Sequence, residues 1–331
     1  LDRSSAASDV YKRQVKMIVD YFDTVYSSIN GRSPFATKLK IYSFFRWLIR
    51  VVANIVIPIS FLLNRRKYCL KITSTTKKEK LIVSLTSFPK RINRLWIVIE
   101  SIFRQSIKPD MVILWLSKEQ FPDRSFIPNS LLSLEKRGLI IELCEGDLRS
   151  HKKYYYALRQ YPNDIIITID DDVIYATDLI LNLLNQHQKY PNAICCTCAS
   201  RIGIEDNKIL PYISWECIDY EIPPSFGVLA IGVGGVLYPP GSLYHMFGEE
   251  DIFMKYCPTA DDLWLNMMAH LKNTPISKTA YRSNYLPIIR FSKVSLSSVN
   301  NGMGANDIQL NRLITYFSLR LNQFPYSMLA K

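Results

Sequence analysis

Three consecutive carboxylates, Asp170, Asp171 and Asp172, directly follow the apolar run Ile165–Ile169. A β-branched run of this kind predicts a buried strand, and carboxylates at the end of such a strand lie at the sheet edge where ligands bind. Adjacent anions repel one another unless a cation lies among them, and oxygen-only ligands suit Mg²⁺ or Mn²⁺, which in turn holds a phosphate. The triplet therefore predicts a metal site. The alternative is an acidic helix N-terminus that Asp171 or Asp172 caps.

The segments that must position these carboxylates alternate between strand and helix from Leu81 onward. The predicted strands are Leu81–Thr86, Met111–Leu116, Leu139–Leu143 and Ile165–Ile169, and the helices between them are Ile92–Gln105, Leu131–Arg137 and His151–Gln160. This alternation predicts parallel βαβ units and a doubly wound α/β sheet. Neither a GxGxxG turn nor a Walker A sequence follows the first strand, so neither a dinucleotide fold nor a P-loop is supported.

The second half of the chain predicts a mixture of strands and helices. We expect a helix at Asp178–Tyr190, strands at Ala193–Ala199 and Leu210–Trp215, a helix at Ala260–Leu271, a strand pair near Tyr285–Phe291 and a terminal helix from about Asn306. In Val228–Pro240, glycines interrupt a strand pattern, which indicates a bulge or a close approach of the backbone to a ligand.

The net charge of +12 is concentrated near the N-terminus, where Arg32–Lys80 holds twelve Lys and Arg residues but a single acid, Glu79. The nearly neutral remainder argues against a nucleic-acid surface and favours a local basic anchor. Within the apolar segment Tyr42–Leu63, the longest uncharged run has thirteen residues, whereas a spanning helix needs about 20. We predict an amphipathic helix in the membrane interface, with Arg46 and Arg50 reaching anionic headgroups. The alternative is a helix packed on the following domain.

These patterns divide the chain into three parts. Residues 1–16 are interpreted as a non-native leader, because Leu1–Gln14 resembles translated adapter sequence. Residues 17–80 form the basic membrane-associating segment, with Lys71–Lys80 as a charged linker, and residues 81–331 form the α/β domain. The seven cysteines predict free thiols in a reducing compartment. Cys195–Cys198 formally holds a CxxC, but its strand-like surroundings favour core cysteines over a zinc site.

Residues 81–331 resemble GT-A fold glycosyltransferases, and are similar to the family 2 enzymes of bacterial surface and capsular polysaccharide biosynthesis. Four features in the family's order carry the resemblance: the strand and polar turn Leu85–Arg91; Ser101–Gln105 followed by Pro109; the DxD-type triplet Asp170–Asp172 after Lys152-Lys153; and Gly234-Gly235 before the acidic pair Asp261-Asp262. The sequence departs from the family where the pair is Asp-Asp instead of Glu-Asp, and where no His follows His270. Asp307 is the candidate substitute for that third metal ligand.

The resemblance implies a Rossmann-like, mostly parallel sheet and a role for each motif. Mn²⁺ or Mg²⁺ on Asp170 and Asp172 would neutralise the leaving diphosphate, while Asp171 is a candidate for the ribose. Thr86, Ser87 and Arg91 would contact the nucleoside, and Lys152 or Lys153 the diphosphate; the alternative for both lysines is a solvated helix face. Gly234 and Gly235 would admit the donor sugar and the acceptor. Trp264 and Trp215 are candidates for stacking on sugar rings, or belong to the core.

Asp262 is the predicted general base, because the helix dipole favours the ionised carboxylate, and Asp261 the helix cap. The two roles could be exchanged, and a capping role alone is the further alternative. The expected reaction is inverting transfer of a sugar from a nucleotide-diphosphate sugar to a glycan or lipid-linked acceptor. The expected location is the cytoplasmic face of the cell membrane, on an anionic surface and without nucleic acid. A metal-dependent nucleotidyltransferase or phosphotransferase and a non-catalytic sugar-binding module remain the alternatives.

Overall fold

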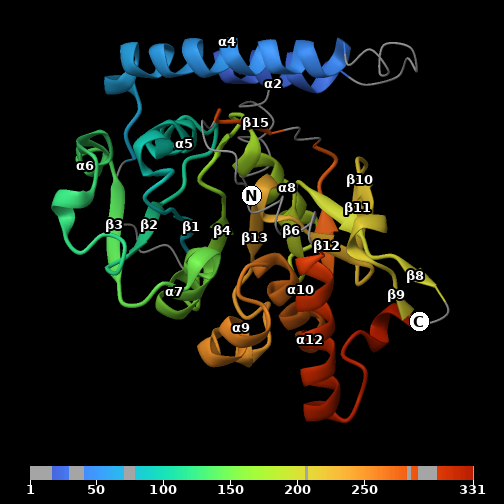
Figure 1. The fold of residues 1–331 in the computed structure, drawn as a ribbon. Helices are drawn as coiled ribbons and strands as arrows, with labels where there is room; N and C mark the ends of the chain where they lie inside the picture. The colour runs from blue at the N-terminus through green and yellow to red at the C-terminus, as the bar shows by residue number, and fades with distance from the viewer. Residues whose placement is uncertain are drawn as a thin grey trace, which may run out of the picture.

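The computed structural model describes residues 17–29, 41–70, 79–205, 208–281, 285–289 and 304–330. The predicted leader and residues 71–78 of the predicted linker lie outside these ranges. The centre of the molecule is an eight-stranded sheet in the order β11-β14-β6-β13-β4-β1-β2-β3 (Figure 1). In chain order its strands are β1 Leu81–Thr86, β2 Met111–Ser117, β3 Leu139–Cys144, β4 Ile165–Thr168, β6 Ile194–Cys196, β11 Ile222–Ser225, β13 Val236–Tyr238 and β14 Ile276–Lys278.

The four strands that precede the acidic triplet are parallel, because β1 pairs in parallel with both β2 and β4, and β2 with β3. β13 is antiparallel to both of its neighbours, β4 and β6. The carboxyl ends of β1 to β4 therefore meet at one edge of the sheet. The predicted α/β class with a mostly parallel sheet is confirmed, and these four predicted strands agree with the observed ones to within one residue at each end.

Helices cover both faces of this sheet (Figure 1). They are α2 Ile18–Ser28, α4 Ile41–Leu63, α5 Leu95–Phe103, α6 Asn129–Glu135, α7 Lys152–Gln160, α8 Leu179–Lys189, α9 Glu250–Tyr256, α10 Asp261–Lys272 and α12 Ala305–Leu321. Alternate residues of β1 face opposite sides, as the two-residue period of a strand requires. Val83 and Leu85 join the core beneath α5, and Ile82 joins the cluster beneath α7. Burial on both faces explains the continuous apolar runs in the sequence.

Short strands complete the fold. β7 Ala199–Arg201, β10 Glu216–Ile218 and β12 Val228–Ala230 form a three-stranded sheet, β5 Val173–Ile174 pairs with β15 Leu286–Pro287, and β8 Ile204–Glu205 pairs with β9 Lys208–Ile209. Of the strand pair expected near Tyr285–Phe291, residues 290–291 lie outside the described ranges.

Three predicted strands are not continuous strands. Ala193–Ala199 divides into β6 and the start of β7, which belong to different sheets. Leu210–Trp215 holds a 3₁₀ turn at Tyr212–Ser214, and Val228–Pro240 divides into β12, a 3₁₀ turn at Gly232–Gly234, and β13. Gly235 directly follows the 3₁₀ turn at Gly232–Gly234 and has φ of +89°. Residues with a side chain rarely adopt this backbone conformation, so the position favours glycine. The last of these breaks brings the backbone N–H of Gly232 to the Asp262 carboxylate.

Helix α4 spans 23 residues and runs along the outer side of α5 together with α2 (Figure 1). Ala53, Ile57 and Phe61 on one face are fully buried. The same face carries Arg46, whose guanidinium lies 4.9 Å from the centroid of the Tyr26 ring of α2. The Nε atoms of Arg46 and Arg50 are both buried. The expectation that these arginines reach lipid headgroups is therefore wrong, because they face the protein.

The opposite face of α4 is apolar and open to solvent. The exposed side chains are Ile41, Phe44, Phe45, Trp47, Leu48, Val52, Ile55, Ile59, Leu62 and Leu63. The helix is long and apolar enough to cross a membrane, with a mean hydropathy of 1.7 over an 18-residue window of which 17% is buried. One face of α4 thus packs on the domain, as the alternative expected, and the other presents an apolar surface; a position in the membrane interface stays a prediction.

A buried carboxylate, Glu100 of α5, joins α4 to the domain. Its side chain has no exposed surface and accepts hydrogen bonds from the guanidinium groups of Arg104 and Arg137. Arg104 also donates to the carbonyl of Phe61 at 3.0 Å, and Arg137 to that of Tyr68 at 2.9 Å. One carboxylate therefore holds two arginines that in turn satisfy the carbonyl groups at the end of α4 and just beyond it.

We expect Glu100→Gln to lower the free energy of unfolding by about 3–5 kcal/mol, because it leaves two buried guanidinium groups without a counter-charge. The measurement is urea unfolding followed by circular dichroism. Glu145, 81% exposed in its ion pair with Lys118, supplies the matched control, and Glu145→Gln should change stability by less than about 0.5 kcal/mol. Equal stability of the two variants would contradict this account of the cluster.

Candidate active site

A cavity of about 700 Å³ opens at the carboxyl edge of β1 and β4. It brings together ten of the predicted site residues, which come from the ends of β1 and β4 and from the starts of α7 and α10: Thr86, Ser87, Arg91, Lys152, Lys153, Asp170, Asp171, Asp172, Asp261 and Asp262. Residues up to 176 positions apart in the sequence thus share one cavity. Such a cavity is where an α/β sheet normally binds its ligand.

The acidic triplet is already paired with side chains of this chain. Asp171 accepts a hydrogen bond from the Ser87 hydroxyl at 2.6 Å and pairs with Arg91. The same guanidinium lies 3.3 Å from Asp172, so Arg91 holds two adjacent aspartates together. Asp170 pairs with Lys153 at 2.7 Å. Neither Asp171 nor Asp172 begins a helix, because β5 follows them, and the helix-cap alternative is wrong.

Lys153 lies between the two acidic motifs. Its Nζ is 2.7 Å from Asp170 and 2.9 Å from Asp261, and only 6% of its side chain is exposed. Burial alone would lower the pKa of the Lys153 ammonium, but three nearby aspartates outweigh burial and hold that pKa well above its usual value. The Ser84 hydroxyl accepts from the Trp115 indole and donates to the Lys153 carbonyl, which fixes the start of α7 on β1.

Lys152 turns to a different partner. Its buried ammonium pairs with Asp147, which follows β3 and also accepts from Gln120 at 2.6 Å. The solvated-face alternative is therefore wrong for both lysines, since their side chains are 2% and 6% exposed.

The two aspartates at the start of α10 differ in their surroundings. Ala260 occupies the N-cap position, and neither carboxylate caps the helix. Asp262 accepts the backbone N–H of Gly232 at 3.1 Å to each oxygen. Burial, together with the neighbouring Asp261 charge, raises the pKa of Asp262 to about 7. Burial acts on Asp261 too, but the Lys153 ammonium outweighs it and lowers the pKa of that carboxyl. Asp262 thus has the pKa suited to exchange a proton near neutrality.

Sequence reasoning missed Gly232, although its contact with Asp262 sets the geometry here. A Cβ at this position would lie 2.9 Å from the Asp262 Oδ1 and 3.0 Å from the Lys153 Nζ. Only glycine therefore lets the backbone N–H reach the carboxylate. No local feature of the sequence distinguishes Gly232 from the neighbouring Gly234 and Gly235.

Tyr175 and Arg149 were also missed. The Tyr175 hydroxyl accepts the Asp170 N–H at 2.9 Å and donates to the Val233 carbonyl at 3.1 Å, so it joins the triplet to the glycine turn. Arg149 lines the cavity with φ of +53°. No local motif marks either residue; the positive φ and the tertiary contact are visible only in the fold.

Four residues with predicted ligand contacts lie away from the cavity. A Cβ on Gly234 would meet Thr197 and Cys198, and one on Gly235 would meet Leu179, so these glycines serve backbone packing. Trp264 has no exposed surface and donates to the Phe247 carbonyl in the core. Asp307 accepts the Tyr212 N–H at 2.7 Å. None of these four residues lines the cavity, and neither does Trp215.

The donor set fits a divalent ion only in part. Among the described residues, no three His, Cys, Asp or Glu side chains form a ready-made metal site. Asp170 and Asp172 supply two carboxylates, and Mg²⁺ and Mn²⁺ are commonly bound by one or two carboxylates completed by phosphate oxygens and water. Six aspartates and four Lys and Arg residues line the cavity, and this excess of negative charge favours a cation. The residues thus fit a metal that a phosphate ligand helps to hold.

No family model matches the sequence, and no curated protein matches it. Among solved structures, S. aureus TarS (residues 1–349) is similar over 62% of this chain and 59% of its own, with 12% identity and a TM-score of 0.43. The 4-diphosphocytidyl-2C-methyl-D-erythritol synthase of Anaerococcus prevotii is similar over 69% and 99%, with 13% identity and a TM-score of 0.41.

The mannosyltransferase PcManGT of Pyrobaculum calidifontis, in complex with GDP-Man and Mn²⁺, is similar over 45% of each chain, with 12% identity and a TM-score of 0.31. The chain thus spans less than two thirds of TarS and of PcManGT. At these TM-scores, the activity of this chain has to be argued from its own residues.

Stability should depend on pH through Asp262. Its pKa is raised from 3.8 to about 7, so the folded state binds more protons than the unfolded state between these values, and stability falls as pH rises through that window. Asp262→Asn removes the buried carboxylate. We expect the variant to match the unsubstituted protein near pH 4 and to exceed it near pH 8 by up to roughly 4 kcal/mol. Urea unfolding at both pH values is the measurement.

Asp251, exposed in the first turn of α9, supplies the matched control, and Asp251→Asn should show no such pH-dependent difference. A loss of stability in Asp262→Asn at pH 8 would contradict the raised pKa.

Proposed function

We propose that this chain is a metal-dependent glycosyltransferase that moves a sugar from a nucleotide-diphosphate sugar to a glycan or lipid-linked acceptor, with inversion, in cell-surface polysaccharide assembly. The observation that carries the proposal is the convergence of the triplet, Lys153 and Asp262 in one cavity. Sugar transfer needs charge compensation for a diphosphate at one side of the anomeric carbon and a base at the other, and this cavity holds candidates for both.

Asp262 is the proposed base. Its carboxylate takes the proton of the acceptor hydroxyl while that oxygen bonds to the anomeric carbon. The bond from this carbon to the diphosphate breaks, and its electron pair leaves with the phosphate oxygen. Two features support this choice over Asp261: the pKa of Asp262 lies near neutrality, and the Gly232 N–H orients its carboxylate. Asp261, ionised beside Lys153, is the weaker base and positions the ammonium.

Asp170 and Asp172 are the proposed holders of Mn²⁺ or Mg²⁺. When bound, the ion would act as a Lewis acid that neutralises the diphosphate. Arg91 holds Asp171 and Asp172 close together, and Ser87 orients Asp171. We assign Asp171, Ser87, Thr86 and Arg91 to the nucleoside side of the cavity. Lys152 and Lys153 line it from α7, where their positive charges face the region proposed for the diphosphate.

A panel of nucleotide sugars tests the activity. The full chain with Mn²⁺ should bind at least one of them, raising its thermal midpoint, and should release the nucleoside diphosphate when an acceptor is added. Absence of any binding across the panel would overturn the proposal.

Two variants separate chemistry from binding. Because the base acts in the transition state, Asp262→Asn should lower kcat by about 10²–10⁴-fold with little change in donor affinity. Asp172→Ala should weaken Mn²⁺-dependent donor binding as well as turnover. The measurements are acceptor-saturated turnover and donor titration calorimetry, with Asp251→Asn as the control expected to leave both unchanged. Near-normal turnover in Asp262→Asn would show that the base lies elsewhere.

We also propose that the apolar face of α4 lies in the membrane interface. Ten exposed apolar side chains on one helix face exceed what the surface of a soluble protein normally carries. Since Arg46 and Arg50 face the protein, burial of apolar area supplies much of the attachment. The basic residues of the N-terminal segment would add attraction to anionic lipids.

The double variant Trp47→Glu/Ile55→Glu should therefore bind liposomes at least about tenfold more weakly, because charge on this face opposes insertion. Vesicle co-sedimentation at low and high salt is the measurement, and the unsubstituted chain should retain most of its binding at high salt. Ile213→Glu is the matched control, since Ile213 is 76% exposed on a distant 3₁₀ turn. Unchanged vesicle binding by the double variant would refute the role of this face.

A further inference from the structure

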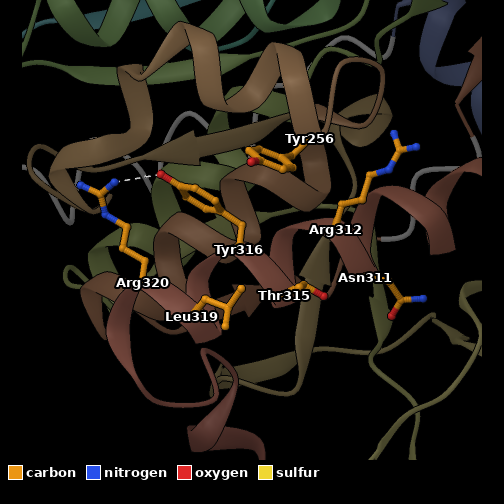
Figure 2. Close-up of a pocket in the computed structure, with 7 residues that line it drawn as sticks. All are labelled: Tyr256, Asn311, Arg312, Thr315, Tyr316, Leu319 and Arg320. Carbon is orange, nitrogen blue, oxygen red and sulfur yellow. Dashed lines mark hydrogen bonds between the residues drawn. The ribbon is translucent and has the colours of Figure 1, made fainter.

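A second cavity lies outside the candidate active site. It is an open groove of about 590 Å³ between the end of α9 and the outer face of α12 (Figure 2). Tyr256 supplies the α9 side, and α12 supplies Asn311, Arg312, Thr315, Tyr316, Leu319 and Arg320. The volume lies within the range typical of sites for small ligands.

An aromatic pair forms the centre of this groove. The ring centroids of Tyr256 and Tyr316 lie 4.8 Å apart with an interplanar angle of 31°. Arg320 donates to the Tyr316 hydroxyl at 2.8 Å and so fixes that ring. Both rings are partly exposed. A partly exposed, oriented tyrosine offers an apolar face and a polar edge, which suits a sugar ring with its C–H face and its hydroxyl rim.

Positive charge flanks the aromatic pair. Figure 2 shows Arg312 and Arg320 on opposite sides of the two tyrosines. The lining contains no acidic residue, and within the described ranges neither arginine makes an ion pair with a carboxylate. A guanidinium binds carboxylate and phosphate groups through paired hydrogen bonds. The groove therefore combines sugar-type and anion-type contacts.

The groove is linked to the candidate active site through both of its walls. Thr259 follows Tyr256 by three residues and lines the cavity of the candidate active site. Asn306, at the start of α12, lines the same cavity. Gln309 accepts the Thr259 N–H at 2.9 Å and ties the two walls together. From Asn306 to Asn311, where the groove begins, the helix rises only about 7.5 Å. Along the axis of α12 the two cavities thus lie close together, with Asn306 on the buried face of the helix and the groove on its outer face.

We propose that this groove binds an anionic acceptor glycan at sugar units behind the reacting end. Sugar rings contact Tyr256 and Tyr316, and carboxylate or phosphate groups of the glycan pair with Arg312 and Arg320. That the bound glycan is an acceptor rests on the proposed glycosyl transfer, whereas the binding of an anionic glycan in the groove does not depend on it. The two helices that form the groove, α9 and α12, lie at the end of the molecule opposite α4 (Figure 1), so the glycan extends away from the proposed membrane face.

Direct titration of the full chain without donor tests the site. The probes are oligogalacturonate, which carries carboxylates, a phosphorylated mannan oligosaccharide, and a neutral malto-oligosaccharide of equal length. At least one anionic probe should bind about tenfold or more tightly than the neutral one, because charge-assisted hydrogen bonds add to the ring contacts. The anionic probe that binds more tightly identifies the charged group. Equal affinity for all three probes, or no binding of any, overturns the proposal.

Variants locate the binding. Arg312→Gln and Arg320→Gln together should reduce anionic-probe affinity about tenfold or more. Arg312→Gln alone, which keeps the hydrogen bond from Arg320 to Tyr316, should leave neutral-probe affinity unchanged. Tyr316→Ala should weaken the binding of both kinds of probe. Arg124→Gln, at a guanidinium 51% exposed on the α6 side, is the matched control. The arginine variants involve exposed side chains and should fold normally. Unchanged anionic binding in the double arginine variant overturns the assignment.

Donor measurements separate this inference from the proposed function. Donor binding with Mn²⁺ should be the same in the double arginine variant and in the unsubstituted chain, while turnover should fall for long anionic acceptors and not for short ones. Probe binding in a chain that binds no nucleotide sugar would uphold the groove and refute the transferase. If the double arginine variant turns over long anionic acceptors as fast as the unsubstituted chain does, the groove proposal is refuted and the transferase proposal is upheld.

Discussion

The candidate active site depends on the buried ammonium of Lys153. Asp170 after β4 and Asp261 at the start of α10 lie on segments 91 residues apart, and their carboxylates would repel one another in a buried cavity without a cation between them. Lys153 contacts both, at 2.7 and 2.9 Å. Its own position follows from the β1–β2 pair, through Ser84 and Trp115. The parallel sheet thus fixes a charge, and that charge joins the two acidic motifs.

The same ammonium makes two neighbouring aspartates chemically different. Asp261 contacts it and stays ionised, so its charge adds to burial in raising the pKa of Asp262. The Gly232 N–H moderates this rise and orients the carboxylate. A pair of acids whose pKa values are pushed apart by their surroundings can divide the tasks of positioning and proton transfer. Adjacent and identical in the sequence, the two residues acquire their roles only from tertiary contacts.

The sequence predicted the parallel strands well because continuous β-branched runs are a local signal. It also predicted ten cavity residues, since motifs at strand and helix ends meet at one sheet edge. Gly232, Tyr175 and the inward direction of Arg46 could not be predicted, because each depends on a partner distant in the chain. For Trp264 the sequence left a sugar-stacking position and a core position open, because an aromatic residue beside an acidic pair has the same local pattern in both; the structure places it in the core.

The pairing of charges in the cavity also constrains how a diphosphate could bind. Arg91 is paired with Asp171 and Asp172, Lys152 with Asp147, and Lys153 with Asp170 and Asp261. Of the cationic side chains that line the cavity, and counting only partners among the described residues, Arg149 alone makes no ion pair. One exposed guanidinium offsets little of the charge of a diphosphate that enters beside six aspartates. Either an added divalent ion compensates that charge, or the ligand must take Arg91 or a lysine from its carboxylate and leave that carboxylate buried and unpaired. The second course is costly, so the charge pattern itself favours a metal-assisted site.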